Sequence, residues 1–187
     1  MEAIGILESN SIAKGIEAAD AILKAADTSL LFSKPVCPGK YTTLFYGDVA
    51  AVQASLEAGE RVTGEHTVDS VVIPRVHPQV IQAINLSTTP EGVNAVGVME
   101  FYSITAAVYA ADAAVKAADV TLIDVRLGIG IGGKSFAVLT GDVAAVEEAV
   151  KCGMAAGIGA QQRSDPEPAR GDLRGTFIMR PEREKTS

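Results

Sequence analysis

The segment Ala3-Ile4-Gly5-Ile6-Leu7-Glu8 occurs a second time, slightly varied, as Ala95-Val96-Gly97-Val98-Met99-Glu100. Two more segments return at the same offset: Ala18-Ala19-Asp20-Ala21 and Lys24-Ala25-Ala26-Asp27 reappear at 110–113 and 116–119. Gly47-Asp48-Val49 returns as Gly141-Asp142-Val143, two residues later than that offset, so the second copy contains an insertion. The chain is therefore an internal duplication, and copies this similar are expected to share one fold.

Composition and charge predict a soluble protein with two ordinary domains. The chain has 187 residues, 48% of them hydrophobic, so each copy can bury a core. The net charge of −7 and the scattered basic residues argue against nucleic acid as a partner. The chain shows neither a membrane-spanning run nor a leader, which predicts no membrane association and a cytoplasmic location. The only cysteines, Cys37 and Cys152, form no CxxC motif, which suits a reducing compartment.

Hydrophobic periodicity predicts one order of elements in each copy. For the first copy we expect strands over 3–7, 29–33, 41–46 and 68–73, and helices over 11–26 and 47–59. Ser9, Asn10 or Ser11 can cap the first helix. The order β-α-β-β-α-β is the split βαβ, or ferredoxin-like, arrangement. It predicts an α+β fold in which each antiparallel sheet carries helices on one face.

The predicted domains are residues 1–86 and 95–180, joined by a linker over 87–94 and followed by a frayed tail over 181–187. The second copy repeats the order from 95 to 153, where its last helix is expected to end. An exposed loop is then expected over 161–175 and a last strand over 176–179. A helix from His77 to Ile84 has no counterpart in the second copy.

One motif suggests a nucleotide site, and its context argues against that reading. Residues 128–135, Gly-Ile-Gly-Ile-Gly-Gly-Lys-Ser, satisfy the phosphate-loop pattern GxxxxGK[ST]. A phosphate loop needs a helix that starts at its Lys-Ser pair, whereas the residues after Lys134 read as a strand. We therefore interpret this stretch as a glycine-rich loop between two strands, where the backbone approaches another group closely.

The whole pattern resembles the tandem-domain shell proteins of bacterial microcompartments. The resemblance rests on the paired segments named above, on both Gly-Asp-Val turns and on Ile73-Pro74-Arg75-Val76-His77. In that family, single-domain members form flat hexamers that tile a shell, and tandem members form trimers whose six domains imitate a hexamer around a pore. The resemblance implies a homotrimer in a shell within the cytoplasm, with other shell proteins as partners at the tile edges.

The resemblance also implies which loops line the pore, since the family turns its β-β loop toward it. The expected pore-lining residues of the two copies are Val36, Cys37, Pro38 and Gly39, and Gly130, Ile131, Gly132 and Gly133.

Threefold symmetry would bring three copies of Cys37 together. Three thiolates can hold a [4Fe–4S] cluster, one per trimer, with one iron left to a non-protein ligand, although such clusters more often have four cysteines. Residues 33–40 look like the loop of the propanediol-utilisation type of tandem shell protein, which carries a pore cluster on a cysteine there. Cys37 is therefore the predicted metal ligand. The resemblance implies electron transfer across the shell or cluster delivery, with redox enzymes or flavoproteins as further partners.

The other candidate ligands have simpler interpretations. Cys152 lies beside Gly153, near the predicted end of a helix, and reads as a structural thiol. His66 precedes a strand, and His77 opens the extra helix, so surface or capping positions are expected for both.

Four basic residues are expected at the tile edges. In the family, a lysine near the end of the first helix packs across the edge between neighbouring tiles, assisted by an arginine after the last strand. The matching residues here are Lys24 and Lys116 with Arg75 and Arg180. The alternative is that both lysines are solvated residues that favour the helix dipole.

Three alternatives to a cluster-bearing tile stay open. A metal-free pore would leave Cys37 as part of a small-molecule channel. A ligand-sensing domain of similar topology would be a monomer or dimer. An enzyme is the weakest alternative, because no catalytic residue is predicted and no acid or base has an evident place beside Cys37.

Overall fold

The computed structural model describes residues 2–90, 92–164 and 175–179, which form two compact units. Unit 1 contains the chain up to Val76 together with Leu127–Lys134. Unit 2 contains His77–Arg126 and the described residues from Ser135 onward. None of the described helices combines the length and apolar character that a bilayer crossing requires.

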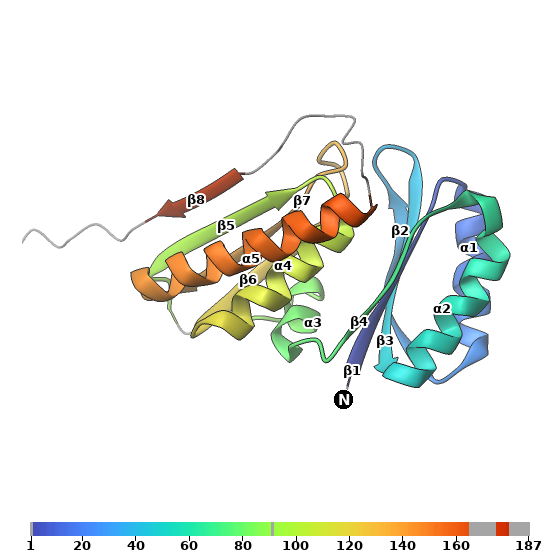
Figure 1. Cartoon of the computed structure of the whole chain (residues 1–187), viewed down its shortest axis with the longest axis horizontal. Coiled ribbons are helices and arrows are strands. Elements are labelled where there is room, and N and C mark those ends of the chain that lie inside the picture. Colours follow the sequence, from blue (N-terminus) through green and yellow to red (C-terminus); the bar gives the residue numbers. More distant parts are fainter. Residues whose placement is uncertain (1, 91, 165–174, 180–187) are drawn as a thin grey trace, which may run out of the picture. The chain divides into compact units, whose positions relative to one another are not determined.

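Unit 1 has the element order that the first copy predicts. Its elements are β1 (Glu2–Ser9), α1 (Ile12–Ala25), β2 (Thr28–Val36), β3 (Lys40–Asp48), α2 (Val49–Thr63), the 3-10 turn η1 (Gly64–His66) and β4 (Thr67–Pro74). The sheet has the order β2-β3-β1-β4, and all neighbouring strands are antiparallel. Helices α1 and α2 cover one of its faces (Figure 1). The predicted α+β class is confirmed.

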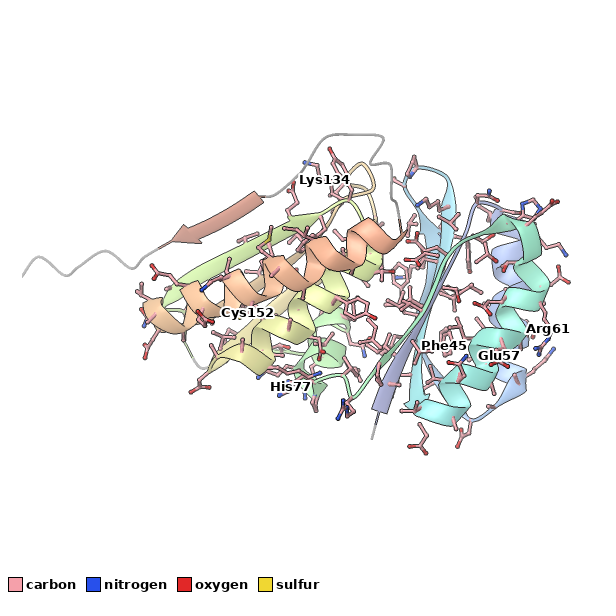
Figure 2. The ribbon with its side chains drawn as sticks, viewed as in Figure 1. Phe45, Glu57, Arg61, His77, Lys134 and Cys152 are labelled. Atoms are coloured by element: carbon pink, nitrogen blue, oxygen red, sulfur yellow. The ribbon has the colours of Figure 1, made fainter. Side chains whose placement is uncertain are left out.

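The core of unit 1 lies between this sheet and its two helices. The ring of Phe45 is fully buried there, in contact with apolar side chains of β1, α1 and α2 (Figure 2). The members of this cluster are Ala3, Leu7, Ala18, Ile22, Phe45, Val52 and Leu56. A Cβ atom on Gly5 would lie 2.4 Å from Cζ of Phe45, so the glycine on β1 leaves the space that the ring fills.

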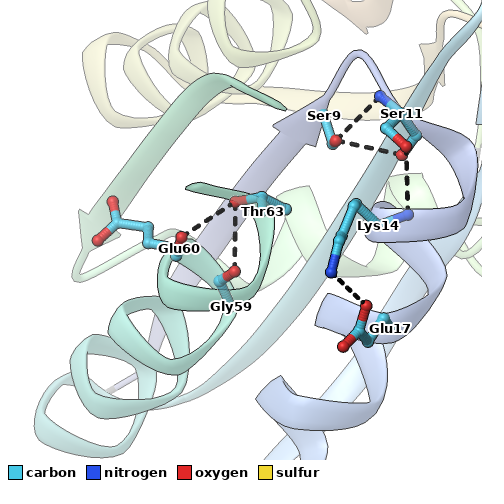
Figure 3. Close-up of polar contacts among 7 residues, drawn as sticks. All are labelled: Ser9, Ser11, Lys14, Glu17, Gly59, Glu60 and Thr63. Atoms are coloured by element: carbon cyan, nitrogen blue, oxygen red, sulfur yellow. Dashed lines mark hydrogen bonds and ion pairs between the residues drawn. The ribbon is translucent and has the colours of Figure 1, made fainter. Parts of the chain in front are cut away.

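Local hydrogen bonds fix the turn into α1 and the end of α2 (Figure 3). The hydroxyl of Ser11 accepts the backbone N–H of Lys14 at 3.4 Å, which makes Ser11 the N-cap among the three predicted candidates. Ser9 accepts the N–H of Ser11 at 3.1 Å. At the end of α2 the Thr63 hydroxyl donates to the carbonyl of Gly59 at 3.3 Å.

Helix α2 was predicted to end at Gly59, but it continues to Thr63. Gly64 follows with φ of 53°, the left-handed conformation that commonly ends a helix. Gly59 is buried, and a Cβ there would come within 2.9 Å of Leu7 and Ile22. This glycine therefore permits close packing of α2 and does not act as a stop.

Unit 2 contains the second copy and one additional helix. Its elements are α3 (Pro78–Ile84), β5 (Ala95–Phe101), α4 (Ile104–Ala117), β6 (Val120–Leu127), β7 (Ser135–Gly141), α5 (Val143–Ser164) and β8 (Gly175–Met179). The sheet order β6-β7-β5-β8 matches that of unit 1 strand by strand. Helices α4 and α5 pack against each other beside this sheet (Figure 1).

Helix α5 is longer than predicted. The helix was expected to end at Gly153, but it continues to Ser164. The first four residues of the loop expected over 161–175 are therefore helical. Gly153 and Gly157 lie inside the helix, and an added Cβ would meet Met99 and Phe101 of β5, respectively. Residues 165–174 of the expected loop and the expected tail over 181–187 lie outside the described residues.

Helix α3, which follows the first copy in sequence, packs in unit 2. The backbone N–H of His77 donates to Asp112 Oδ1 of α4 at 2.8 Å. Gln79 accepts the N–H of Leu122 at 2.9 Å and donates to the carbonyl of Val120 at 3.5 Å. The extra helix therefore covers the edge formed by α4 and β6.

Candidate pore loops

Cys37 lies at the tip of the hairpin formed by β2 and β3. Val36 pairs with Lys40, so residues 37–39 form the whole turn. The predicted loop over 34–40 is thus shorter than expected, and Pro35 lies within β2, an edge strand, where proline is tolerated. The Cys37 side chain is exposed.

The stem of this hairpin is fixed by side-chain hydrogen bonds on both faces of the sheet. On the helix side, Ser33 Oγ lies 3.1 Å from the Tyr41 hydroxyl and 3.2 Å from Thr43 Oγ1. On the other side, Glu8 accepts from Lys40 Nζ and from Thr42 Oγ1, both at 3.3 Å. These contacts hold the strands that lead into and out of the Cys37 turn.

The glycine-rich loop is not a phosphate loop. β7 begins at Ser135, so the predicted strand after Lys134 is confirmed, and the helix that a phosphate loop requires does not start there. Four glycines in this loop have positive φ: Gly128, Gly130, Gly132 and Gly133. The loop is closed by a hydrogen bond in which the N–H of Gly128 donates to the carbonyl of Lys134 at 3.1 Å.

The two predicted loops meet within unit 1. The N–H of Cys37 donates to the carbonyl of Gly128 at 3.1 Å. A Cβ on Gly133 would lie 2.8 Å from the carbonyl oxygen of Cys37, so only glycine allows this approach. The glycine-rich loop therefore holds the N–H of Cys37 by a hydrogen bond and packs closely against its carbonyl.

The predicted pore-lining residues differ in how far their side chains are exposed. Val36 is 5% exposed and belongs to the core, whereas Cys37, Pro38 and Gly39 are exposed at the turn. On the second loop Gly130, Ile131 and Gly132 are exposed, and Gly133 is partly buried against Cys37. Ile129 is 50% exposed and was missing from the predicted set, although the glycines on either side of it were a signal for the same loop.

Glu8 is the buried ionisable group nearest to this stem. Burial raises the pKa of its carboxyl above 4.5 and is opposed by the charge of Lys40, while Asp69 raises the pKa further. Between pH 4.5 and the higher pKa, the folded protein binds more protons than the unfolded chain. The stability that Glu8 contributes is therefore lost as pH rises through this window.

We expect Glu8→Gln to remove this pH dependence while keeping an acceptor for Thr42. In the wild type, this one group can lower the free energy of unfolding by at most about 1.4 kcal/mol per pH unit. Urea unfolding from about pH 4 to about pH 8 measures the slope. Glu57→Gln, at an exposed position on α2, is the matched control and should keep the wild-type slope. An unchanged slope in Glu8→Gln would contradict the prediction.

The other candidate ligands have local partners. Cys152 was predicted to lie near the end of a helix, but it lies inside α5 (Figure 2). Its thiol donates to Glu148 Oε1 at 3.3 Å. This hydrogen bond to a carboxylate raises the pKa of the Cys152 thiol. Nδ1 of His77 accepts the N–H of Gln79, so this residue is the expected cap of α3. Nδ1 of His66 lies 3.0 Å from Oδ1 of Asn10, within hydrogen-bond distance.

No group of three or more potential metal ligands occurs within the described part of a single chain.

The predicted tile-edge lysines form the same ion pair in both copies. Lys24 Nζ lies 2.7 Å from Asp20 Oδ2 on α1, and Lys116 Nζ lies 2.5 Å from Asp112 Oδ2 on α4. Arg75 is exposed just after β4, and its φ is 56°. Arg180 lies outside the described residues.

Comparison with known families agrees with the duplication. The profile described as "BMC domain" matches twice, over residues 3–76 and 95–164. The chain belongs to the BMC-domain family. It is a structural shell protein of a bacterial microcompartment, built from two BMC domains, and its family is structural rather than catalytic.

Relatives that match most of the chain and relatives that match less than half of it both support this assignment. The BMC-domain chain is 48% identical to the bacterial microcompartment shell protein PduT of Citrobacter freundii, over 80% of this chain and 81% of the relative. It is 37% identical to the carboxysome shell protein CcmK2 of Thermosynechococcus vestitus, over 40% of this chain and 78% of that one. The crystal structure of a microcompartment protein from Desulfitobacterium hafniense has a TM-score of 0.86 at 46% identity, covering 96% of this chain and 94% of that one.

Proposed function

We propose that three copies of this BMC-domain chain form a tile of the shell and that their three Cys37 thiolates hold one [4Fe–4S] cluster in its pore. Exposure of the thiol at the tip of the β2–β3 hairpin is the observation that carries this proposal. A buried cysteine could not reach ligands on other chains.

The residues around Cys37 fit a cluster shared between chains. No group of three or more potential metal ligands lies within the described residues of one chain, which suits a cluster that takes one cysteine from each of three subunits. Three thiolates leave one iron for a non-protein ligand. Gly39, Gly130 and Gly132 have open space at the Cβ position, so these parts of the two loops offer little steric obstruction.

When bound, a cluster of this type accepts and donates single electrons. Its place in a shell would suit electron transfer between the interior and the cytoplasm, or delivery of the cluster to enclosed enzymes. Redox enzymes or flavoproteins would then be partners. The role of the protein chain is to hold the thiol at a fixed turn, through the stem contacts of Ser33 and Glu8 and the Cys37–Gly128 hydrogen bond.

A metal-free pore is the second candidate function. It is favoured by the number of ligands, because one cysteine in the β2–β3 turn of each chain gives a trimer three thiolates in the pore, whereas clusters of this type usually have four. In this alternative the exposed loop residues, including Ile129 and Ile131, line a channel for small molecules.

Visible and EPR spectra of protein purified without oxygen distinguish the two functions. We expect broad absorption near about 400 nm and about four irons per trimer, the values typical of a cubane cluster. Cys37→Ala should lose both signals. Cys152→Ala is the matched control, since it also removes one thiol per chain, and it should keep them.

A colourless wild-type trimer after cluster reconstitution would overturn the cluster and leave the metal-free pore. Equal loss of iron in both cysteine variants would also contradict a specific site at Cys37.

At the tile edges, Lys24 and Lys116, with Arg75 and Arg180, are proposed to contact neighbouring shell proteins. Support comes from the equivalent positions of the two lysines in the repeat and from their shared pairing with an aspartate one turn earlier. This pairing fixes each lysine on its helix.

A further inference from the structure

The two loops that meet at Cys37 differ in charge from the rest of the chain. Residues 34–40 and 127–134 contain three lysines, Lys34, Lys40 and Lys134, and no acidic residue. The whole chain has 23 acidic residues against 16 basic ones, and its net charge is −7. Basic residues are therefore gathered beside the exposed thiol of a chain that is acidic as a whole.

Lys34 is the exposed member of this set, whereas Lys40 and Lys134 are partly buried. Its Nζ lies 5.5 Å from the centroid of the Phe32 ring, a cation–π contact that holds the ammonium group without neutralising it. No carboxylate of the described residues is paired with Lys34. The positive charge three residues before Cys37 is therefore open to a partner.

Lys40 lies on the other arm of the hairpin and has a partner of its own. Its Nζ lies 3.3 Å from Glu8 Oε2, and burial raises the pKa of this carboxyl. The Lys40 side chain remains 35% exposed. It therefore adds to the basic character of the hairpin, but Lys34 carries the charge that is most accessible.

The glycine-rich loop adds apolar side chains at the same place. Ile129 is 50% exposed and Ile131 is 38% exposed. Both lie on the loop whose Gly128 carbonyl accepts the N–H of Cys37. An apolar centre with a charged rim is the composition of a protein interface. We call this surface the Cys37 surface, and it consists of Lys34, Cys37, Pro38, Ile129 and Ile131.

The form of the Cys37 surface does not suit a small ligand. Small-molecule sites are concave and enclose most of the ligand. A Cβ atom on Gly39, Gly130 or Gly132 would have nothing within 4 Å, so the loops are open at these positions and do not enclose a pocket there. Exposed isoleucines also give no favourable contact to a hydrated ion. The surface therefore fits a partner that is itself a protein.

We infer that the Cys37 surface docks an acidic one-electron carrier protein, with carboxylates of the carrier facing Lys34 and apolar residues contacting Ile129 and Ile131. This inference rests on the proposed function, because the carrier would exchange its electron with the cluster at Cys37. One electron passes between the two centres, and no bond forms or breaks. Charge complementarity speeds the encounter of such partners, and transient redox complexes bury little surface.

The local charge and the net charge predict opposite partners, which gives the test. A plant-type [2Fe–2S] ferredoxin is the acidic probe, and cytochrome c is the basic one. Surface plasmon resonance measures the binding of each to the full-length protein purified without oxygen. We expect the ferredoxin to bind, with an association rate that falls between about 0.01 M and about 0.15 M salt as screening increases.

Lys34→Glu should lower the association rate of the ferredoxin about 10-fold or more, the low end of electrostatic steering. Lys151→Glu is the matched control, because it makes the same charge change at an exposed lysine of α5, and it should keep the wild-type rate. Ile129→Ser should raise the dissociation rate about fivefold through loss of apolar contact. Both variants at the Cys37 surface should keep the wild-type circular dichroism spectrum and iron content. If Lys34→Glu unfolds the protein, Ile129→Ser tests the same surface.

Three results would overturn the inference. The first is binding of cytochrome c and not of the ferredoxin. The second is equal loss of ferredoxin binding in Lys34→Glu and Lys151→Glu. The third is binding of citrate, used as a small-anion probe, without binding of the ferredoxin.

Iron content separates this inference from the proposed function. A wild-type protein that contains iron but does not bind the ferredoxin would overturn only the docking surface. A wild-type protein that binds the ferredoxin through Lys34 but contains no iron after reconstitution would overturn the cluster and leave the docking surface standing.

Discussion

Phe45→Ala is expected to lower the free energy of unfolding by about 4 kcal/mol, the cost typical of removing a fully buried phenylalanine ring. The ring lies between β1 and the two helices of unit 1, in contact with residues that are themselves fully buried. Truncation would leave a cavity, because rigid strands on one side and packed helices on the other restrict collapse. Urea unfolding followed by circular dichroism measures the loss.

Tyr46→Ala is the control for this variant. It removes an aromatic ring from the next position of the same strand, where the side chain is only partly buried, and its effect should be clearly smaller. Equal losses in the two variants would show that burial of the ring is not the cause.

The glycine beneath the ring allows a further check. Gly5→Ala alone should also destabilise the protein, because the new Cβ would clash with the Phe45 ring. Combined with Phe45→Ala, the same methyl group would enter the cavity instead. The double variant should therefore lose less stability than the sum of the two single changes.

Gly153→Val is expected to lower the free energy of unfolding by about 3 kcal/mol, at the upper end of overpacking effects. A Cβ at this position would lie 2.5 Å from Met99 Sδ and 2.8 Å from the carbonyl oxygen of Ala110. The methionine can move, but the carbonyl belongs to the backbone of α4 and cannot move without shifting the helix.

Gly153→Ala gives the sharper test because two effects predict opposite signs. In a free helix, alanine is more stable than glycine by about 1 kcal/mol. Here the contact with Ala110 should reverse that gain, so the alanine variant should also be less stable than the wild type. Gly92→Ala, at a position with nothing within 4 Å, is the control and should change the stability little. A stabilised Gly153→Ala would contradict the close packing of α5 on α4.

The glycines explain where prediction from sequence succeeded and where it failed. Gly59 and Gly153 were expected to end helices, because an isolated glycine disfavours a helix and often follows its last turn. Both lie inside helices, where they let α2 and α5 approach their neighbours. Local propensity lost to tertiary packing, which the local sequence does not contain.

By itself, the sequence determined the duplication, the order β-α-β-β-α-β in each copy, the antiparallel sheets and the rejection of the phosphate loop. Each of these depends on periodicity or on a short turn signal, and both are local properties of the chain. The sequence also identified Cys37 as the residue to examine.

Only the tertiary structure decided which residues around Cys37 are exposed and that its turn is hydrogen bonded to Gly128. It also decided that α3, encoded directly after the first copy, covers the second. Equivalent residues of two similar copies, such as Ile16 and Val108, also differ in exposure. The physical reason is that exposure depends on segments distant in sequence, so two nearly identical stretches can have different surroundings.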